Sequence, residues 1–234
     1  MANLGSNRRF SRQPRAPVMR ADPGRALSRV LLSGLIAAAA GIGLWSLRYL
    51  LPSQPHAVHF ENFINQHTAF TVHAAFASIA LLVGPWQFLL LSCTGWKHRL
   101  VGRIYVSAVA LGWLASLPLA LHAHTGAAAS AGFQVLGIGW ITCTLLGLVN
   151  VRAGRLFEHR RWMIRSYALT TAAITLRIYI AVSDILSIPL AQSYPYIAWI
   201  CWIPNALAAE LLIRVTTTPR SFASVCCTSW TTKG

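Results

Sequence analysis

The stretch HRRWMIRSYALTTAAITLRIYIAVSD, residues 159–184, decides the fold class of this 234-residue chain. It opens with a basic cluster and then runs through residues 167–182 with Arg177 as the only charged residue. About 20 mostly apolar residues in a helix are enough to cross a bilayer. Because a charge that faces lipid is costly, Arg177 is expected to point toward other helices or water. The stretch therefore predicts a membrane-spanning helix with a basic end and one guanidinium within it.

The composition agrees with a membrane protein. Hydrophobic residues make up 55% of the chain, the mean hydropathy is +0.52, and only 11% of the residues are charged, whereas soluble domains carry about 25% charged residues. The net charge of +15 lies in short runs between apolar segments and not on one soluble face, so we expect a lipid bilayer as partner and no nucleic acid. The five cysteines form no C-x-x-C or C-x-x-C-H pattern, and no metal site is predicted.

Five further apolar runs have a similar length. With the opening stretch they predict an all-α, polytopic transmembrane bundle of about six helices within residues 30–215. Residues 1–29 are rich in arginine and proline and are expected to form a basic, disordered cytoplasmic arm, and residues 216–234 a short cytoplasmic tail. In the second run, Gly84-Pro85 predicts a break in the helix. The five runs are residues 30–51, 68–91, 101–121, 132–149 and 194–215.

Basic residues are segregated along the chain. All lysines and arginines except Arg48 and Arg177 lie before the first run, in or close to the second and fourth connections, or at and after the end of the last run. The connections at residues 52–67, 122–131 and 185–193 contain neither lysine nor arginine. Cytoplasmic loops of membrane proteins carry the excess of these residues. Both termini are therefore predicted to lie in the cytoplasm.

A short motif occurs twice at the cytoplasmic ends. Residues 98–105, HRLVGRIY, resemble residues 159–167, HRRWMIRSY, if one inserted residue is allowed. Each copy opens a span from the same side of the membrane, so the two helical hairpins that contain them are interpreted as a weak parallel repeat. The alternative is that loops next to a membrane favour histidine, arginine and tyrosine in any case.

The same motifs resemble a known family. The pattern comprises His73, Gly84-Pro85, H-R-x-x-G-R-x-Y at 98–105, H-R-x-W-M-x-R-S-Y at 159–167, and Arg177. It is similar to a family of predicted bacterial multi-pass membrane proteins known as domain of unknown function 2306, over about residues 72–184. This resemblance implies a helical bundle in the bacterial inner (cytoplasmic) membrane and implies no particular activity.

The histidines are the first candidate site. A b-type haem held between two helices needs two neutral imidazoles at facing positions and basic groups for its propionates. His73 with His122 or His124 would supply one pair at the outer side, which is the leading hypothesis, and His98 with His159 a second pair at the inner side. A histidine at a membrane surface also commonly contacts lipid headgroups or caps a helix end. The candidate propionate partners are Arg177, Arg99, Arg103 and Arg165.

Two other functions fit the same residues. The arginines would let a non-catalytic module or carrier bind an anionic lipid or metabolite, although Arg177 could instead bond to helix carbonyls. The chain could also be a structural partner of other membrane subunits. Whether it is an enzyme stays open, because the sequence contains no nucleophile elbow, phosphate loop, zincin or dinucleotide motif. Glu210 is expected to be a counter-ion or to reach the cytoplasm, while Gln87, Gln134 and Asn205 are expected to form interhelical hydrogen bonds.

Overall fold

A computed structural model describes residues 23–47, 66–89, 95–121 and 126–216 of the chain, and these residues form helices and no strand. The chain divides into two units, residues 1–34 and residues 35–234, and the packing described below lies within the second. The predicted arm and tail fall largely outside the described residues and stay predictions. The helices are α1 (Pro23–Leu47), α3 (His67–Leu89), α4 (Trp96–Leu121), α5 (Ala127–Arg152), α6 (Leu156–Thr170), α7 (Ala172–Ile185), α8 (Leu190–Ile200) and α9 (Ile203–Thr216).

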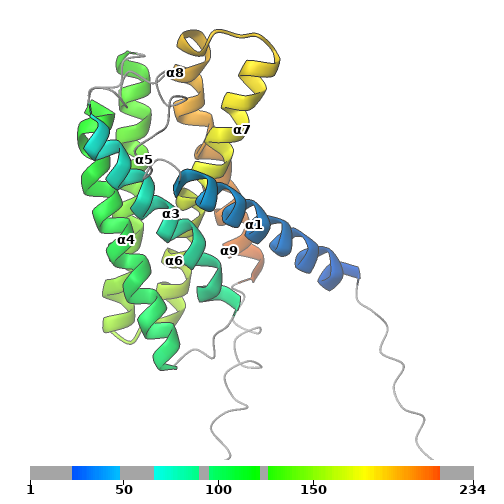
Figure 1. Ribbon diagram of the computed structural model, residues 1–234. Coiled ribbons are helices and arrows are strands. Elements are labelled where there is room, and N and C mark those ends of the chain that lie inside the picture. The colour runs from blue at the N-terminus through cyan, green and yellow to red at the C-terminus, as the bar shows by residue number, and fades with distance from the viewer. Residues whose placement is uncertain (1–22, 48–65, 90–94, 122–125, 217–234) are drawn as a thin grey trace, which may run out of the picture. The chain divides into compact units, whose positions relative to one another are not determined.

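Five described segments are long and apolar enough to cross a membrane, namely α3, α4, α5, α6 with α7, and α8 with α9 (Figure 1). This confirms the predicted multi-pass helical bundle. The apolar part of α1 within the described residues, Ser33–Ser46, is shorter than a full span. The connections between spans are short, so consecutive spans run in opposite directions and pack as neighbours.

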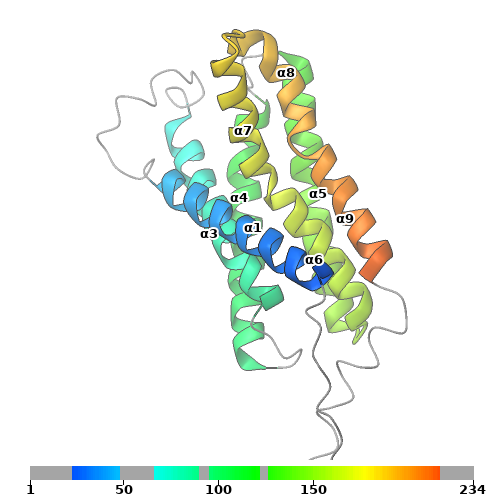
Figure 2. The ribbon, with the colours of Figure 1, turned by 90° about the vertical axis from the view of Figure 1, so that its right-hand side faces the viewer.

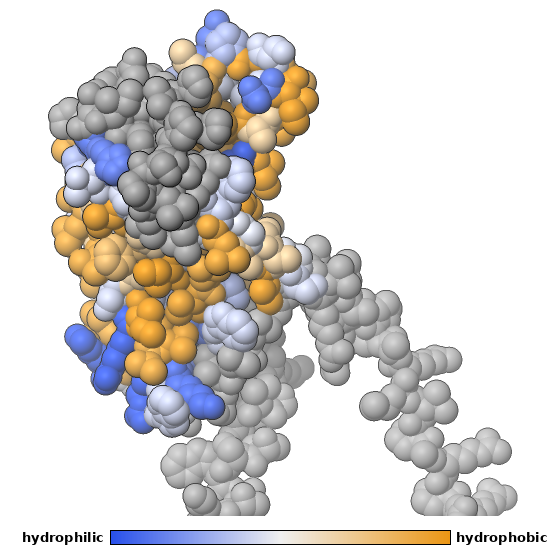
Figure 3. Space-filling view, in the orientation of Figure 1, coloured by the Kyte–Doolittle hydropathy of each residue, from blue (hydrophilic) through white to orange (hydrophobic). Residues whose placement is uncertain are grey.

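Apart from Arg177, the described basic residues of the second unit gather at one end of the bundle. That end carries the beginnings of α4 and α6 and the ends of α5 and α9, and it is the lower end in Figure 1. Figure 3 shows hydrophilic residues at this end and a hydrophobic band above them. The segregation of charge expected from the sequence is thus present in space, whereas the assignment of this end to the cytoplasm stays a prediction from the positive-inside rule. We call it the basic end.

The core of the bundle lies between α3, α4, α5 and α6. It centres on Tyr105, Val109, Trp140 and Tyr167, all of which are buried. Small residues let these helices approach closely, which is the usual source of packing energy within a bilayer. A Cβ atom placed on Gly147, for example, would lie 2.7 Å from the Met163 sulfur.

The expected break at Gly84-Pro85 is wrong, because α3 continues through Pro85 to Leu89. Proline has no N–H, so the carbonyl four residues earlier, that of Leu81, loses its helical donor. The Tyr167 hydroxyl of α6 donates a hydrogen bond to this carbonyl at 3.2 Å. Gly84 makes room for it, since a Cβ atom there would lie 2.1 Å from the Tyr167 ring. The helix therefore tolerates its proline because another helix supplies the missing donor.

Two of the spans are interrupted, at Thr171 between α6 and α7 and at Cys201–Trp202 between α8 and α9. The interruptions lie against each other. The Asn205 amide is within 3.2 Å of both Thr171 Oγ1 and Thr175 Oγ1 and 3.3 Å from the Cys201 carbonyl oxygen. Thr175 Oγ1 also donates to that carbonyl. As Figure 2 shows, α7 and α8 form a hairpin beyond the interruptions, at the end opposite to the basic end.

Candidate functional site

The inner histidines come together at the basic end. His98 lies in the first turn of α4 and His159 in the first turn of α6, and their ring centroids are 6.4 Å apart with an interplanar angle of 82°. His159 Nδ1 lies 2.8 Å from the Gly147 carbonyl oxygen of α5. Because a carbonyl only accepts hydrogen bonds, Nδ1 carries the proton, and a neutral ring then has its lone pair on Nε2. We call these two residues the inner histidine pair.

Polar atoms without partners lie next to this pair. His98 Nδ1 and Gln87 Nε2 are both buried and have no hydrogen bond in the described part of the chain. The Gln87 amide packs against α4 one turn beyond His98, where a Cβ atom on Gly102 would lie 3.4 Å from Gln87 Nε2. Within the described part of the chain, Gln87 Nε2 thus makes no interhelical hydrogen bond of the kind expected. Buried polar groups are nearly always hydrogen-bonded, so such exceptions often indicate an absent water, ion or ligand.

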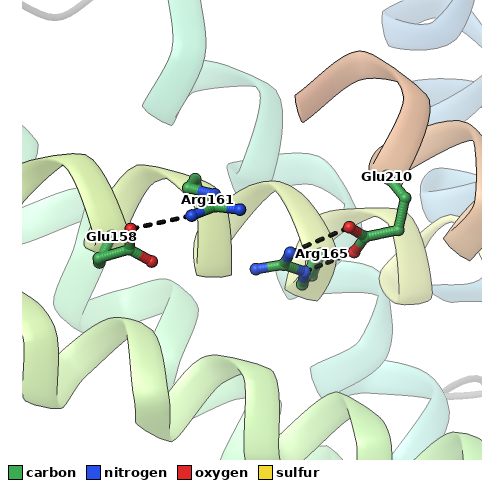
Figure 4. Close-up of polar contacts among 4 residues, drawn as sticks. All are labelled: Glu158, Arg161, Arg165 and Glu210. Atoms are coloured by element: carbon green, nitrogen blue, oxygen red, sulfur yellow. Dashed lines mark hydrogen bonds and ion pairs between the residues drawn. The ribbon is translucent and has the colours of Figure 1, made fainter. Parts of the chain in front are cut away.

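The arginines expected to accompany the inner histidine pair differ in their surroundings. Arg99 and Arg103 are exposed at the basic end. Arg165 instead makes a bidentate ion pair with Glu210 of α9, with Nε–Oε1 and Nη2–Oε2 distances of 2.5 and 3.0 Å (Figure 4). Its guanidinium also lies 4.6 Å from the centre of the Trp162 ring. Of the two roles expected for Glu210, the structure thus shows the counter-ion.

A second pair of charges at this end is local. Arg161 Nη1 donates to Glu158 Oε1 at 2.9 Å, three residues away on the same helix (Figure 4). Both side chains are about one-third exposed, at 33% and 37%. Such a pair contributes little to stability. The Arg165–Glu210 pair is the one of the two that joins different helices, and it ties α6 to α9.

A cavity of about 1030 Å³ lies in the other half of the bundle, and we call it the outer cavity. His73 and Arg177, both candidates from the sequence, line it together, although 104 residues separate them. Aromatic side chains from four helices form much of its wall, with Tyr194 adding a hydroxyl. These aromatic residues are Trp45, Phe70, Phe133, Trp140 and Tyr194. Large cavities with a mostly apolar wall and a few convergent polar groups are the usual form of a ligand site.

His73 is fixed within the outer cavity by its backbone contact. Its Nδ1 lies 2.9 Å from the carbonyl oxygen of Gly112 in α4, so Nδ1 is the donor. Arg177 is held by α1 and by its own helix, since Nη1 donates to the Ala173 carbonyl at 2.8 Å and Nη2 to Ser46 Oγ at 2.6 Å. The expected bond from Arg177 to a helix carbonyl is thus present. His122 and His124, the expected partners of His73, lie outside the described residues, so the outer haem pair stays a prediction.

Between the two histidine levels lies a network of hydroxyl groups that sequence reasoning missed. The Tyr105 hydroxyl of α4 lies 2.8 Å from both Ser166 Oγ and Thr170 Oγ1 of α6. From α5, Trp140 Nε1 donates to Thr170 Oγ1 at 2.9 Å, and Thr144 Oγ1 lies 2.7 Å from Ser166 Oγ. Neutral hydroxyl groups give no charge signal in a sequence, but Tyr105 and Ser166 both lie within the repeated motif, which was the available clue.

This network contains more donor–acceptor pairs than hydrogen atoms to fill them. Thr144 Oγ1 can also donate to the Trp140 carbonyl, and Thr170 Oγ1 to the Ser166 carbonyl. One indole N–H and four hydroxyls supply five hydrogens to six pairs. The hydroxyls therefore have more than one satisfied arrangement. The remaining predicted hydrogen bonder, Gln134, donates within its own helix to Ser130 Oγ at 2.8 Å, so the expected interhelical bond is replaced by a local one.

Comparison with known proteins gives one result. A family described as predicted membrane protein, DUF2306, matches residues 70–213, which extend beyond the stretch that carries the motifs. No curated protein and no solved structure matches the chain. The matched region contains the inner histidine pair, the outer cavity histidine and the hydroxyl network. The chain belongs to the DUF2306 family of predicted membrane proteins.

Proposed function

We propose that this membrane protein binds a b-type haem at the inner histidine pair and takes part in electron transfer. The observation that carries the proposal is the approach of His98 and His159, which come from segments 61 residues apart, to a centroid distance of 6.4 Å with nearly perpendicular rings. Two imidazoles that bind one metal from opposite sides, each with a nitrogen at about 2 Å, have centroids about 6 Å apart. Edge-to-face ring pairs without a metal also reach such distances, so the proposal rests on this approach together with the unpartnered polar atoms beside it.

The surroundings of the pair fit this role. The bond from His159 Nδ1 to the Gly147 carbonyl fixes the ring and leaves Nε2 as the lone-pair nitrogen, which is how ligand histidines are commonly oriented. The unpartnered Gln87 Nε2 and His98 Nδ1 are consistent with a site completed by a bound group. Haem would supply a one-electron iron centre, while the protein would provide the axial nitrogens.

The propionate partners follow from the charges. Arg165 is already paired with Glu210, so it supports this role less than the sequence indicates. Arg99 and Arg103 are exposed at the basic end near the start of α4, and we propose them as the groups that bind the propionates. Their exposure is no obstacle, because haem propionates are themselves charged and favour the water-facing side of a site.

An absorbance spectrum tests the proposal. Protein purified in detergent is expected to show haem bands that sharpen on reduction with dithionite, and His98→Ala and His159→Ala are each expected to abolish them. His73→Asn distinguishes the two candidate haem levels, because loss of the bands in this variant alone would place the haem at the outer pair instead. A colourless protein that takes up no added haemin would overturn the proposal, as would bands that survive both inner substitutions.

The second candidate is a module that binds an anionic lipid or metabolite, and Arg177 in the wall of the outer cavity is the observation that favours it. Its guanidinium is already bonded to Ala173 and Ser46, so an anion would have to share or replace these contacts. Mass spectrometry of lipid that co-purifies with the wild type and with Arg177→Gln tests this function. Equal amounts of each anionic lipid in the two preparations would count against it.

A further inference from the structure

The outer cavity has a feature that neither the haem nor the anion accounts for. His73 Nδ1 donates to the Gly112 carbonyl, and no other hydrogen bond of this ring occurs in the described part of the chain. Nε2 is not among the buried atoms that lack a partner, so it retains accessible surface, and His73 lines the cavity. Because His73 lines the cavity and Nδ1 is engaged, we take Nε2 as the ring nitrogen that would meet a ligand there.

The protonation of the ring decides what this nitrogen can bind. A second positive charge beside Arg177 in an apolar cavity would be costly, so the ring is neutral. With the proton on Nδ1, Nε2 is only an acceptor. A ligand group that meets it must bring its own hydrogen, as a hydroxyl does. A carbonyl oxygen or a carboxylate offers only lone pairs and would meet Nε2 unfavourably.

The residues that line the outer cavity indicate what the rest of the ligand is made of. Five aromatic side chains line the cavity, and flat rings pack well against them in offset or edge-to-face arrangements. The other contacts are mostly aliphatic, from residues such as Leu81, Leu119 and Leu176. A volume of about 1030 Å³ lies at the upper end of the ~300–1,000 Å³ typical of small-molecule sites, so a ring and part of a tail fit inside it.

We propose that the outer cavity binds a lipid-soluble, hydroxylated aromatic molecule of the hydroquinone type, whose hydroxyl donates to His73 Nε2. The apolar tail of such a molecule would lie along the aliphatic wall. This site does not involve the inner histidine pair, so a negative result for haem binding would leave this proposal unaffected. It also differs in chemistry from the anion candidate, which relies on Arg177.

A binding assay with matched ligands tests this. The probe is a tritiated short-chain alkyl hydroquinone, kept reduced under anaerobic conditions and measured by scintillation proximity on the full-length protein in detergent. The competitor is its dimethyl ether, which has the same ring and tail but no hydroxyl hydrogen. We expect saturable binding and at least about tenfold weaker competition by the ether, as for the loss of one good buried hydrogen bond. Equal competition by the two compounds would overturn the proposal, as would a lack of saturable binding.

Two substitutions separate the two nitrogens of His73. The amide nitrogen of asparagine can replace Nδ1 and keep the bond to Gly112, but nothing replaces Nε2, so His73→Asn is expected to weaken hydroquinone binding about tenfold. Glutamine places its amide oxygen near Nε2, so His73→Gln should bind within about threefold of wild type. Wild-type affinity in His73→Asn contradicts the proposal. If both variants fail to fold, the comparison of the two ligands on the wild type decides. A fatty acid that displaces the probe as well as the hydroquinone does would favour the anion candidate instead.

Discussion

The Tyr167 side chain of α6 compensates for two irregular features of α3. Its ring occupies the space that Gly84 leaves open, and its hydroxyl reaches the Leu81 carbonyl that Pro85 deprives of a donor. The hydrocarbon core of a bilayer contains no water that could donate to such a carbonyl. A carbonyl without a hydrogen-bond donor there costs several kcal/mol of stability. The glycine, the proline and the tyrosine therefore act as one unit, although 82 residues separate Pro85 from Tyr167.

Gly84→Ala is expected to destabilise the protein. The new Cβ atom would lie 2.1 Å from the Tyr167 ring, so the ring must move and its hydrogen bond to Leu81 is lost. Overpacking of this kind costs about 1–3 kcal/mol. Thermal unfolding in detergent, followed by circular dichroism, measures the effect. Gly41→Ala is the control, because no atom lies within 4 Å of the position of its Cβ, and equal melting temperatures for the two variants would contradict the prediction.

Among the elements, the interrupted spans depend on each other. The amide of Asn205 in α9 bonds across to Thr171 and Thr175, and it also bonds to the Cys201 carbonyl beside it. These contacts add a partner from α9 to groups that already have local ones, since Thr171 Oγ1 also donates to the Ala168 carbonyl and Thr175 Oγ1 to the Cys201 carbonyl. The interruptions border the outer cavity, whose wall includes Thr170, Ala172 and Cys201. Irregular backbone at membrane depth is tolerated where it lines such a cavity.

Asn205→Ala is expected to lower the free energy of unfolding by more than Asn150→Ala does. It removes hydrogen bonds between helices, which are worth about 0.6 kcal/mol on average and up to about 1.7 kcal/mol in membrane proteins. Asn150→Ala is the matched control, because Asn150 donates within its own helix to the Leu146 carbonyl. Chemical or thermal unfolding of both variants gives the comparison. An Asn150 variant as unstable as the Asn205 variant would argue against a special role for the interruptions.

The pair formed by Arg165 and Glu210 is expected to couple α6 to α9. A double-mutant cycle with Arg165→Met and Glu210→Gln should give a coupling energy of about 1 kcal/mol, near the top of the range for partly exposed pairs. The side chains are 20% and 42% exposed, so a larger value is not expected. Melting temperatures of the four proteins provide the measurement. Additive effects of the two substitutions would mean that the bidentate contact stabilises nothing.

For the molecule as a whole, the sequence predicted the architecture well because apolar length and the positions of arginine are strong signals. The inner histidine pair was also predictable, since His98 and His159 occupy the same place in the repeated motif. The hydroxyl network and the continuity of α3 were not. Tyr105, Ser166 and Tyr167 act through partners on helices that are far apart in the sequence. Apart from the repeated motif, nothing in the sequence near them distinguishes a buried hydroxyl in a network from one at a headgroup.

The topology gives a prediction at this scale. Ser187 lies in the exposed turn between α7 and α8, and Ala153 in the exposed turn between α5 and α6 at the basic end. If the basic end is cytoplasmic, a membrane-impermeant thiol reagent should label Ser187→Cys in intact cells and Ala153→Cys only after permeabilisation. The wild type, with its own cysteines, serves as the background. The reverse pattern would place the basic end outside.

The hydrogen bond from Tyr167 to Leu81 has a consequence for biosynthesis. A membrane chain is inserted from its amino terminus, so α3 enters the bilayer while the part of the chain that will become α6 is not yet synthesised. During that interval the Leu81 carbonyl has to rely on a temporary partner, and the groove beside Gly84 is empty. The packing of the α3–α4 hairpin is therefore complete only after α6 has been inserted. The insertion of α6 is the step that joins this hairpin to the α5–α6 hairpin.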